Sequence, residues 1–187
     1  MAERLVLHYN HFDEELFNDL FTLLLYTAQK LNPKRTEDMI RKSIAWRQDG
    51  KIHSDIALEY PQSFIKKYWV LFSKTKDGVP IGYLNAGAMS FKEGVTTLGR
   101  ILWVKYWVMI IAQLEQQMIS YNKIRNREAK QINPGSACGL VVLVDTKNFS
   151  SLQLLNADVI RAAIEVSSSL VNFVPGLFDT IDTLFLA

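Results

Sequence analysis

Hydrophobic residues recur at helical spacing in the N-terminal part of the chain. Leucines repeat every three or four positions between Asp13 and Leu31, and acidic residues occupy the first turn, where the helix dipole favours them. Asn32 and Pro33 end this helix, because proline lacks a backbone donor and disfavours helix in the residue before it. Pro33 also suits the first turn of a second helix, which is predicted to stop near Gly50. The two helices are predicted to form a hairpin.

The pattern changes after a short helical turn at 54–58 and a helix starting at Pro61. Residues 68–73 are rich in aromatic and β-branched side chains and predict a strand. Residues 74–78 end in Asp-Gly and predict a turn, and 79–85 predict the returning strand. Pro80 is expected at the start of that strand or on an edge, because it cannot donate to the ladder.

The second half of the chain alternates helices and strands. Residues 87–94 predict a loop, and 95–127 predict one long helix whose buried stripe includes Ile101 and Leu102. The continuous apolar run 139–144 predicts a strand covered on both faces. A helix over 156–172 and a strand from 181 to 187 follow. This order predicts an α/β layered architecture with an N-terminal helical extension.

Composition narrows the function classes. The 187 residues suit one domain, and 49% of them are hydrophobic, which is enough for a full core. A net charge of +2 without a clustered basic excess disfavours nucleic acid as a partner, while permitting weak attraction to an anionic membrane. The one cysteine, Cys138, allows no intrachain disulfide and fits a reducing compartment. The longest apolar stretch, 101–112, is too short to span a bilayer, and the N-terminus has no signal-type apolar core.

Motifs for nucleotide binding and nucleophilic catalysis are incomplete. Residues 94–100 resemble a phosphate-binding loop but lack its lysine and its hydroxyl residue, so we interpret them as a loop entering a helix. Ser136 and Cys138 precede an apolar strand, whereas the serine of a nucleophile elbow follows one. Neither segment predicts an enzyme.

Titratable residues do not form a predicted catalytic or metal-binding set. His8, His11 and His53 have no cysteine or histidine cluster beside them, and metal ligation needs several converging donors. Asp145 ends an apolar strand, where α/β folds place ligands, but we prefer to interpret it as a turn residue that accepts from the backbone before Lys147. We therefore predict no catalytic residue, no metal and no cofactor.

Four segments, taken in order, resemble the CRAL-TRIO (Sec14-like) lipid-binding family across nearly the whole chain. They are the helix 39–47 that ends in Trp-Arg, the strand entry 77–84, the run 139–145 followed by Phe149 to Leu152, and Val174-Pro175 before the strand 181–186. The resemblance implies an N-terminal helical module over 1–59 and a lipid-binding domain with a mixed sheet flanked by helices over 60–187.

The chain departs from the family pattern in three places. Basic residues of the first helical hairpin are absent from 23–28, and Val79 stands where arginine or lysine is common. The family's remaining strand and gate helix are expected beyond Ala187, so the lipid-binding domain is expected to be incomplete.

The resemblance implies binding and intracellular transfer of a hydrophobic molecule or lipid, of the phosphoinositide, retinoid, tocopherol or sterol class, without chemistry. The alternative is a non-catalytic protein-interaction or scaffold module with a degraded cavity. Expected partners are the lipid, a transient membrane surface and a protein, in the cytoplasm and peripherally at membranes. The predicted cavity-lining residues are Tyr83, Asn85, Val142, Val144, Ile160 and Ile164.

Overall fold

The computed structural model describes residues 29–52, 54–128, 140–173 and 181–186. The predicted helix from Asp13 therefore lies outside the described residues, apart from its last positions. The second predicted helix is confirmed as α2, Pro33–Asp49. Asn32 caps it by accepting a hydrogen bond from the Arg35 backbone N–H, and Gly50 ends it. Helix α3, Ile56–Glu59, and helix α4, Gln62–Lys67, follow.

Four strands form one mixed sheet in the order β1-β2-β3-β4. Strands β1, Leu71–Lys74, and β2, Pro80–Asn85, are antiparallel and joined by the predicted turn, in which Gly78 takes a φ of 89°. Strand β3, Leu140–Asp145, runs parallel to both β2 and β4, Ile181–Leu186. The predicted apolar strand at 139–144 is thus confirmed as an interior strand, and Pro80 is the first residue of its strand as expected.

The first predicted strand begins later than the pattern indicated. Tyr68 is the C-cap of α4 and is 1% exposed. Its hydroxyl donates to the carbonyl of Ser90, and its own carbonyl accepts from the Tyr106 hydroxyl at 2.6 Å. Because these contacts hold Tyr68 in the core, the strand begins only at Leu71. The aromatic character of residues 68–70 reflects burial more than strand propensity.

The predicted long helix is wrong at its start, because it is two helices. Helix α5, Phe91–Leu98, and helix α6, Arg100–Arg125, are bent by 116° at Gly99. Gly99 has a φ of 76° and a ψ of 154°, a conformation that is almost restricted to glycine. Ser90 caps α5, and Glu93 follows three residues later, which is the spacing of a capping box. That spacing was the signal for a helix where a loop was predicted.

The break also changes which residues of α6 are buried. Ile101 and Leu102 are 78% and 48% exposed, although they belonged to the predicted buried stripe. The buried side of α6 instead includes Trp103, Tyr106 and Met109. Among the described residues no single helix has both the length and the apolar composition to cross a membrane, although α5 and α6 would if counted together.

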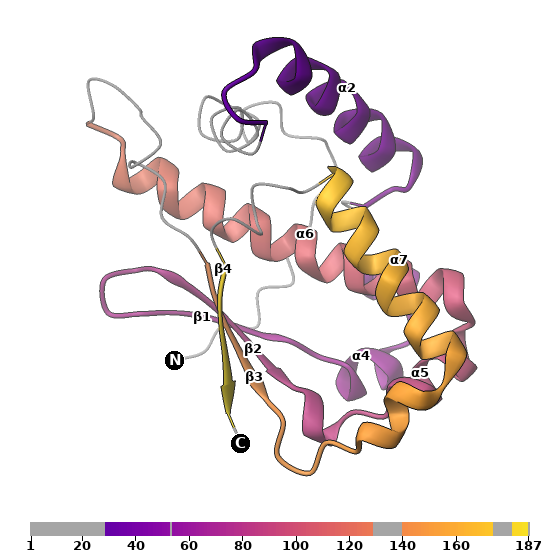
Figure 1. Ribbon diagram of the computed structural model, residues 1–187. Coiled ribbons are helices and arrows are strands. Elements are labelled where there is room, and N and C mark those ends of the chain that lie inside the picture. Colours follow the sequence, from indigo (N-terminus) through magenta and orange to yellow (C-terminus); the bar gives the residue numbers. More distant parts are fainter. Residues whose placement is uncertain (1–28, 53, 129–139, 174–180, 187) are drawn as a thin grey trace.

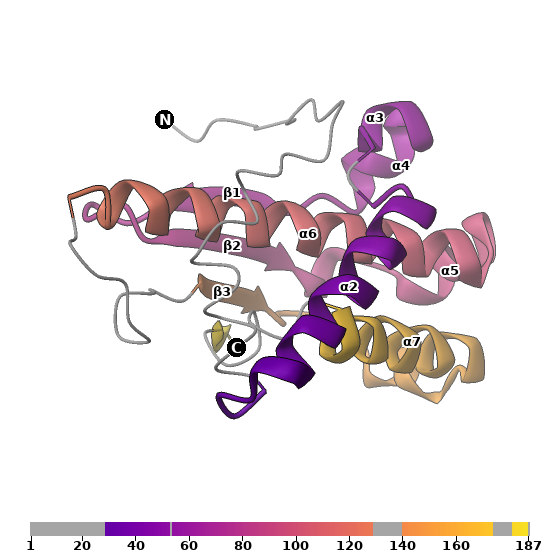
Figure 2. The same ribbon diagram turned by 90° about the horizontal axis from the view of Figure 1, so that it is seen from above.

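Helix α6 lies along one face of the sheet, and α7, Ala157–Phe173, lies beside it with α2 crossing above (Figures 1 and 2). The short 3-10 helices are Ala86–Ala88 and Ser151–Leu155. A β-carbon on Gly82 would lie 2.9 Å from Leu114, so glycine lets α6 approach β2 closely.

Figure 1 shows no described helix over the opposite face of the sheet, where β3 residues after Leu140 stay half-buried. Within the described part of the chain, β3 is thus covered on one face only, so the strand is confirmed there but its predicted coverage on both faces is not.

A buried ion pair joins α2 to α6. The Arg47 guanidinium contacts the Glu115 carboxylate through two hydrogen-bonded contacts of 2.7 and 3.1 Å, and its Nε donates to the Ser43 hydroxyl. The side chains of Arg47 and Glu115 are 0% and 4% exposed. Burial raises the pKa of the Glu115 carboxyl, and the charge and hydrogen bonds of Arg47 oppose that rise. The N-terminal helix is thus held to the rest of the protein, while the division into regions 1–59 and 60–187 stays a prediction.

We expect Arg47→Met to lower the free energy of unfolding by about 3–5 kcal/mol, because it leaves the Glu115 carboxylate buried without its cation. Arg41→Met is the matched control, since Arg41 pairs with Glu37 on the exposed side of the same helix. That substitution is expected to change the free energy by less than about 1 kcal/mol. Urea unfolding measures both. Equal effects of the two substitutions would show that the buried pair does not hold α2.

Candidate functional site

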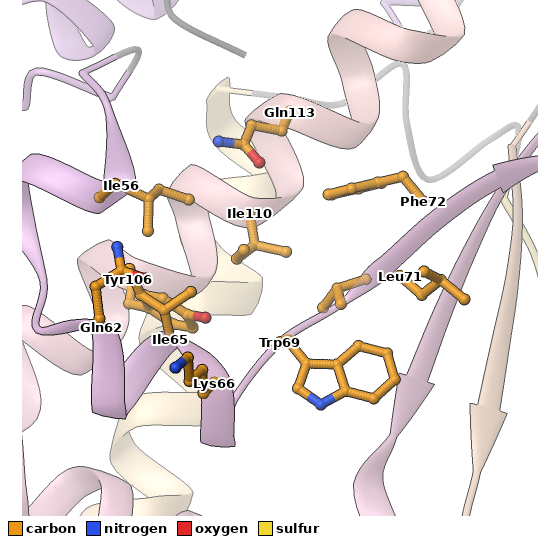
Figure 3. A pocket seen from close by; sticks show the side chains of 12 residues that line it. Ile56, Gln62, Ile65, Lys66, Trp69, Leu71, Phe72, Tyr106, Ile110 and Gln113 are labelled. Atoms are coloured by element: carbon orange, nitrogen blue, oxygen red, sulfur yellow. The ribbon is translucent and has the colours of Figure 1, made fainter. Parts of the chain in front are cut away.

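A cavity of about 310 Å³ lies beside the β1 edge of the sheet, between α3, α4 and α6 (Figure 3). Its walls come from four segments, which are α3, α4, the residues from Trp69 to Phe72, and α6. The lining residues are Ile56, Ala57, Gln62, Ile65, Lys66, Trp69, Val70, Leu71, Phe72, Tyr106, Ile110 and Gln113.

Helical spacing explains which side chains α4 and α6 present to the cavity. Tyr106, Ile110 and Gln113 lie four and then three residues apart on α6, so they share one face. Gln62 and Lys66 lie one turn apart on α4. The polar Gln113 thus interrupts an apolar helical stripe, which was the available sequence signal for this wall.

Hydrogen bonds and caps fix the helices around the cavity. The Asp55 carboxylate caps α3 by accepting from the Ala57 backbone N–H at 2.8 Å. The Tyr60 hydroxyl donates to the Leu102 carbonyl, which ties the end of α3 to the start of α6. Lys105 and Glu59 form an ion pair at 3.1 Å between the same two helices, and the hydrogen bond from Lys105 is the main reason that the pKa of Glu59 is lowered.

Packed aromatic rings support the wall between α4 and α6. Phe64 lies 4.6 Å from Tyr68 and 5.2 Å from Tyr106, measured between ring centroids, and Trp103 packs edge-on against Tyr68. Burial raises the pKa of Tyr68 to about 12, and it raises the pKa values of Tyr60 and Tyr106 as well. These hydroxyls stay protonated near pH 7 and donate hydrogen bonds without adding charge to the wall.

The lining is chemically simple. It contains no serine, cysteine, histidine, aspartate or glutamate, so the cavity wall offers no pair of nucleophile and base. Its one charged side chain is Lys66, and Gln62 and Gln113 are its uncharged amides. Among the described residues no group of three histidines, cysteines or acids converges as metal ligands would. This arrangement can hold an apolar molecule and orient a polar end of it.

The six residues predicted to line a cavity are not brought to one surface. Tyr83 pairs with Leu143 and Asn85 with Asp145, so these side chains lie on the face away from α6. Val142 packs with Leu114 on the α6 side of the sheet.

Val144 lies on the same face as Val142 by strand alternation, while Asn85 also caps the 3-10 turn by accepting from the Ala88 N–H. Ile160 and Ile164 are 42% and 59% exposed on α7, which buries Val159 and Ala162 instead. None of the six lines the 310 Å³ cavity, and their contact with a ligand stays a prediction.

Tyr83 nevertheless adjoins the cavity through Trp69. The two rings lie 6.2 Å apart and are tilted by 37°, and Trp69 is itself a lining residue. The Tyr83 hydroxyl donates to the Asp145 carboxylate at 2.9 Å. The other carboxylate oxygen of Asp145 accepts from the Lys147 backbone N–H at 2.9 Å, as expected for the turn residue. Both carboxylate oxygens are thus occupied by local structure.

Comparison with known proteins identifies the fold. No family model matches this sequence, and no curated protein matches it. Among solved structures the chain is similar to Sfh5, a Sec14-family protein, with a TM-score of 0.63 and 12% sequence identity. The match covers 94% of this chain and 56% of the Sfh5 chain, so this chain spans little more than half of that protein. The protein has an α/β Sec14-like fold, as the sequence predicted.

The contacts of Asp145 make its pKa depend on Tyr83. The Lys147 N–H is the main cause that lowers the pKa of Asp145, followed by the Tyr83 hydroxyl. We therefore expect Tyr83→Phe to raise the pKa of Asp145 while leaving it below that of a free aspartate. Because the folded pKa is lowered, the stabilisation by Asp145 exists above its unfolded pKa and is lost as the pH falls through the folded value. Carboxyl carbon NMR titration measures the shift, and an unchanged pKa of Asp145 in the variant would contradict this assignment.

Proposed function

We propose that the protein binds a hydrophobic ligand or lipid in the cavity beside β1 and carries it without chemistry. The observation that supports this is an apolar cavity of about 310 Å³ on a Sec14-like fold. Removing apolar ligand surface from water contributes about 2.5 kcal/mol for each ~100 Å² buried. Binding by this route needs no cofactor, no metal and no nucleophile, which is consistent with the proposed role of a carrier.

The proposal includes a place of action, in the cytoplasm and peripherally at membranes. Leu58 follows two residues that line the cavity and is 84% exposed on α3. Ile101 is 78% exposed on α6, close to the contact between Tyr60 and Leu102 that joins the two helices. Two exposed aliphatic side chains, of which Leu58 directly follows the lining residues of α3, support transient contact with a lipid surface.

A second candidate function is that of a protein-interaction module. Exposed aliphatic residues also support it, including Leu152 at 72% and Leu155 at 77% exposure in the 3-10 turn before α7. Such side chains mark interaction surfaces when they gather in a patch. This candidate requires no bound ligand, whereas the carrier requires one in the cavity, and that difference separates the two.

We expect Ala57→Trp to reduce the amount of bound ligand at least about tenfold. A large ring placed on this half-buried wall position fills the cavity. Leu58→Trp is the matched control, since the neighbouring side chain is exposed and does not line the cavity. Native mass spectrometry of protein purified from cells measures the bound hydrophobic molecules, and equal unfolding midpoints establish that both variants fold.

Absence of any bound ligand in the unmodified protein, together with a stable protein partner, would favour the interaction module. Retention of ligand by Ala57→Trp would place the ligand elsewhere and contradict the proposed site.

A further inference from the structure

The cavity lining is asymmetric in charge. Seven of its twelve residues have side chains without a polar atom and two more are Trp69 and Tyr106, so Gln62, Gln113 and Lys66 stand out by their polarity. Lys66 is the one lining residue with a full charge, and no acid accompanies it in the wall. Figure 3 shows Lys66 beside Ile65 and Trp69, at the end of the labelled group away from Gln113.

Neighbouring cations are already neutralised, and Lys66 is not. Lys67 pairs with Glu93 at 2.6 Å, and Lys105 pairs with Glu59 at 3.1 Å. Within the part of the chain that the structure describes, Lys66 forms no ion pair. Its aliphatic stem can lie along the apolar wall while the ammonium stays in contact with water. A free cation at the rim of an apolar cavity complements an amphiphile whose head is an anion.

The volume restricts the apolar part of such a ligand. A cavity of about 310 Å³ lies at the small end of the roughly 300–1,000 Å³ that ligand pockets span. That space suits a single hydrocarbon chain better than a two-chain phospholipid. Gln62 lies one turn from Lys66 on α4, so its amide can donate to the same head group.

We propose that the ligand of this cavity is a single-chain amphiphile with an anionic head, a carboxylate or a phosphate, which the Lys66 ammonium and the Gln62 amide bind at the rim. This inference rests on the proposed carrier function and specifies its ligand class. The hydrocarbon chain of the ligand would enter the apolar space between α4, the residues before β1 and α6. The ion pair would form where water still reaches Lys66, so its contribution decreases with ionic strength.

Isothermal titration calorimetry with three probes of equal chain length tests the inference. Dodecanoate carries a carboxylate, dodecyl phosphate carries a phosphate and dodecanol carries no charge, all used below their micellar or solubility limits. The unmodified protein is expected to bind both anions more tightly than dodecanol, and the tighter anion identifies the head group. Raising the salt concentration is expected to narrow the difference between the anions and dodecanol.

Substitution of Lys66 isolates the head-group contact. Lys66→Met is expected to weaken binding of both anions about two- to fivefold, the range for a solvent-exposed ion pair, and to leave dodecanol unchanged. Lys66→Arg is expected to retain the preference for anions. Lys67→Met is the matched control, since Lys67 lies outside the cavity and pairs with Glu93, and it is expected to change none of the three affinities.

The possible results distinguish the anionic head group of the ligand from the carrier function. Equal binding of dodecanol and the anions, or anion binding unaffected by Lys66→Met, would overturn the anionic head while leaving the carrier function in place. Failure of all three probes to bind would count against both. Loss of all three on Ala57→Trp would confirm that the measured binding occurs in this cavity.

Discussion

The packing of α6 against one face of the sheet is the constraint on which the rest of the structure depends. Gly82 permits close approach of Leu114, and Leu140 and Met118 complete the contact in the same cluster. On its other sides α6 receives Arg47 from α2 and packs along α7. The figures show α2 and α7 on the same side of the sheet as α6, and both contact α6, although α2 also packs on α7. Loss of either partner of the buried ion pair would leave the other charge buried without its counterion.

The cavity follows from the same packing. Between α4 and α6, Phe64 packs on Tyr106 and Tyr68 packs on Trp103 through ring contacts. In the described part of the chain β1 is an edge strand, and the cavity wall passes along it from Trp69 to Phe72 and continues to Ile110 on α6. An apolar space of this kind favours a hydrophobic guest through partition alone, so the proposed function requires stable walls more than reactive groups.

Local signals in the sequence predicted most elements, and tertiary contacts explain where they failed. Pro33, Gly50, Pro80 and the Asp77-Gly78 turn act through backbone conformation, so they could be interpreted without knowing the fold. Gly99 was an exception, because an isolated glycine within a helical pattern is usually tolerated, whereas here its positive φ bends the chain.

The cavity could not be predicted because its wall combines residues from α4, the entry to β1 and α6, whose relation depends on the whole packing. The strand residues predicted to line a cavity face opposite sides of the sheet, because the relative phase of β2 and β3 depends on their register, in which Tyr83 aligns with Leu143 and not with Val142.

The proposed function places a hydrophobic ligand in the space between α4, β1 and α6. Backbone amide NMR during titration with dodecanoate tests it most directly, because each amide reports its own surroundings. We expect shift changes at Ile65, Trp69 and Ile110 and none at Leu143 and Ile164. Changes confined to Leu143 and Ile164, with the cavity amides unaffected, would contradict it.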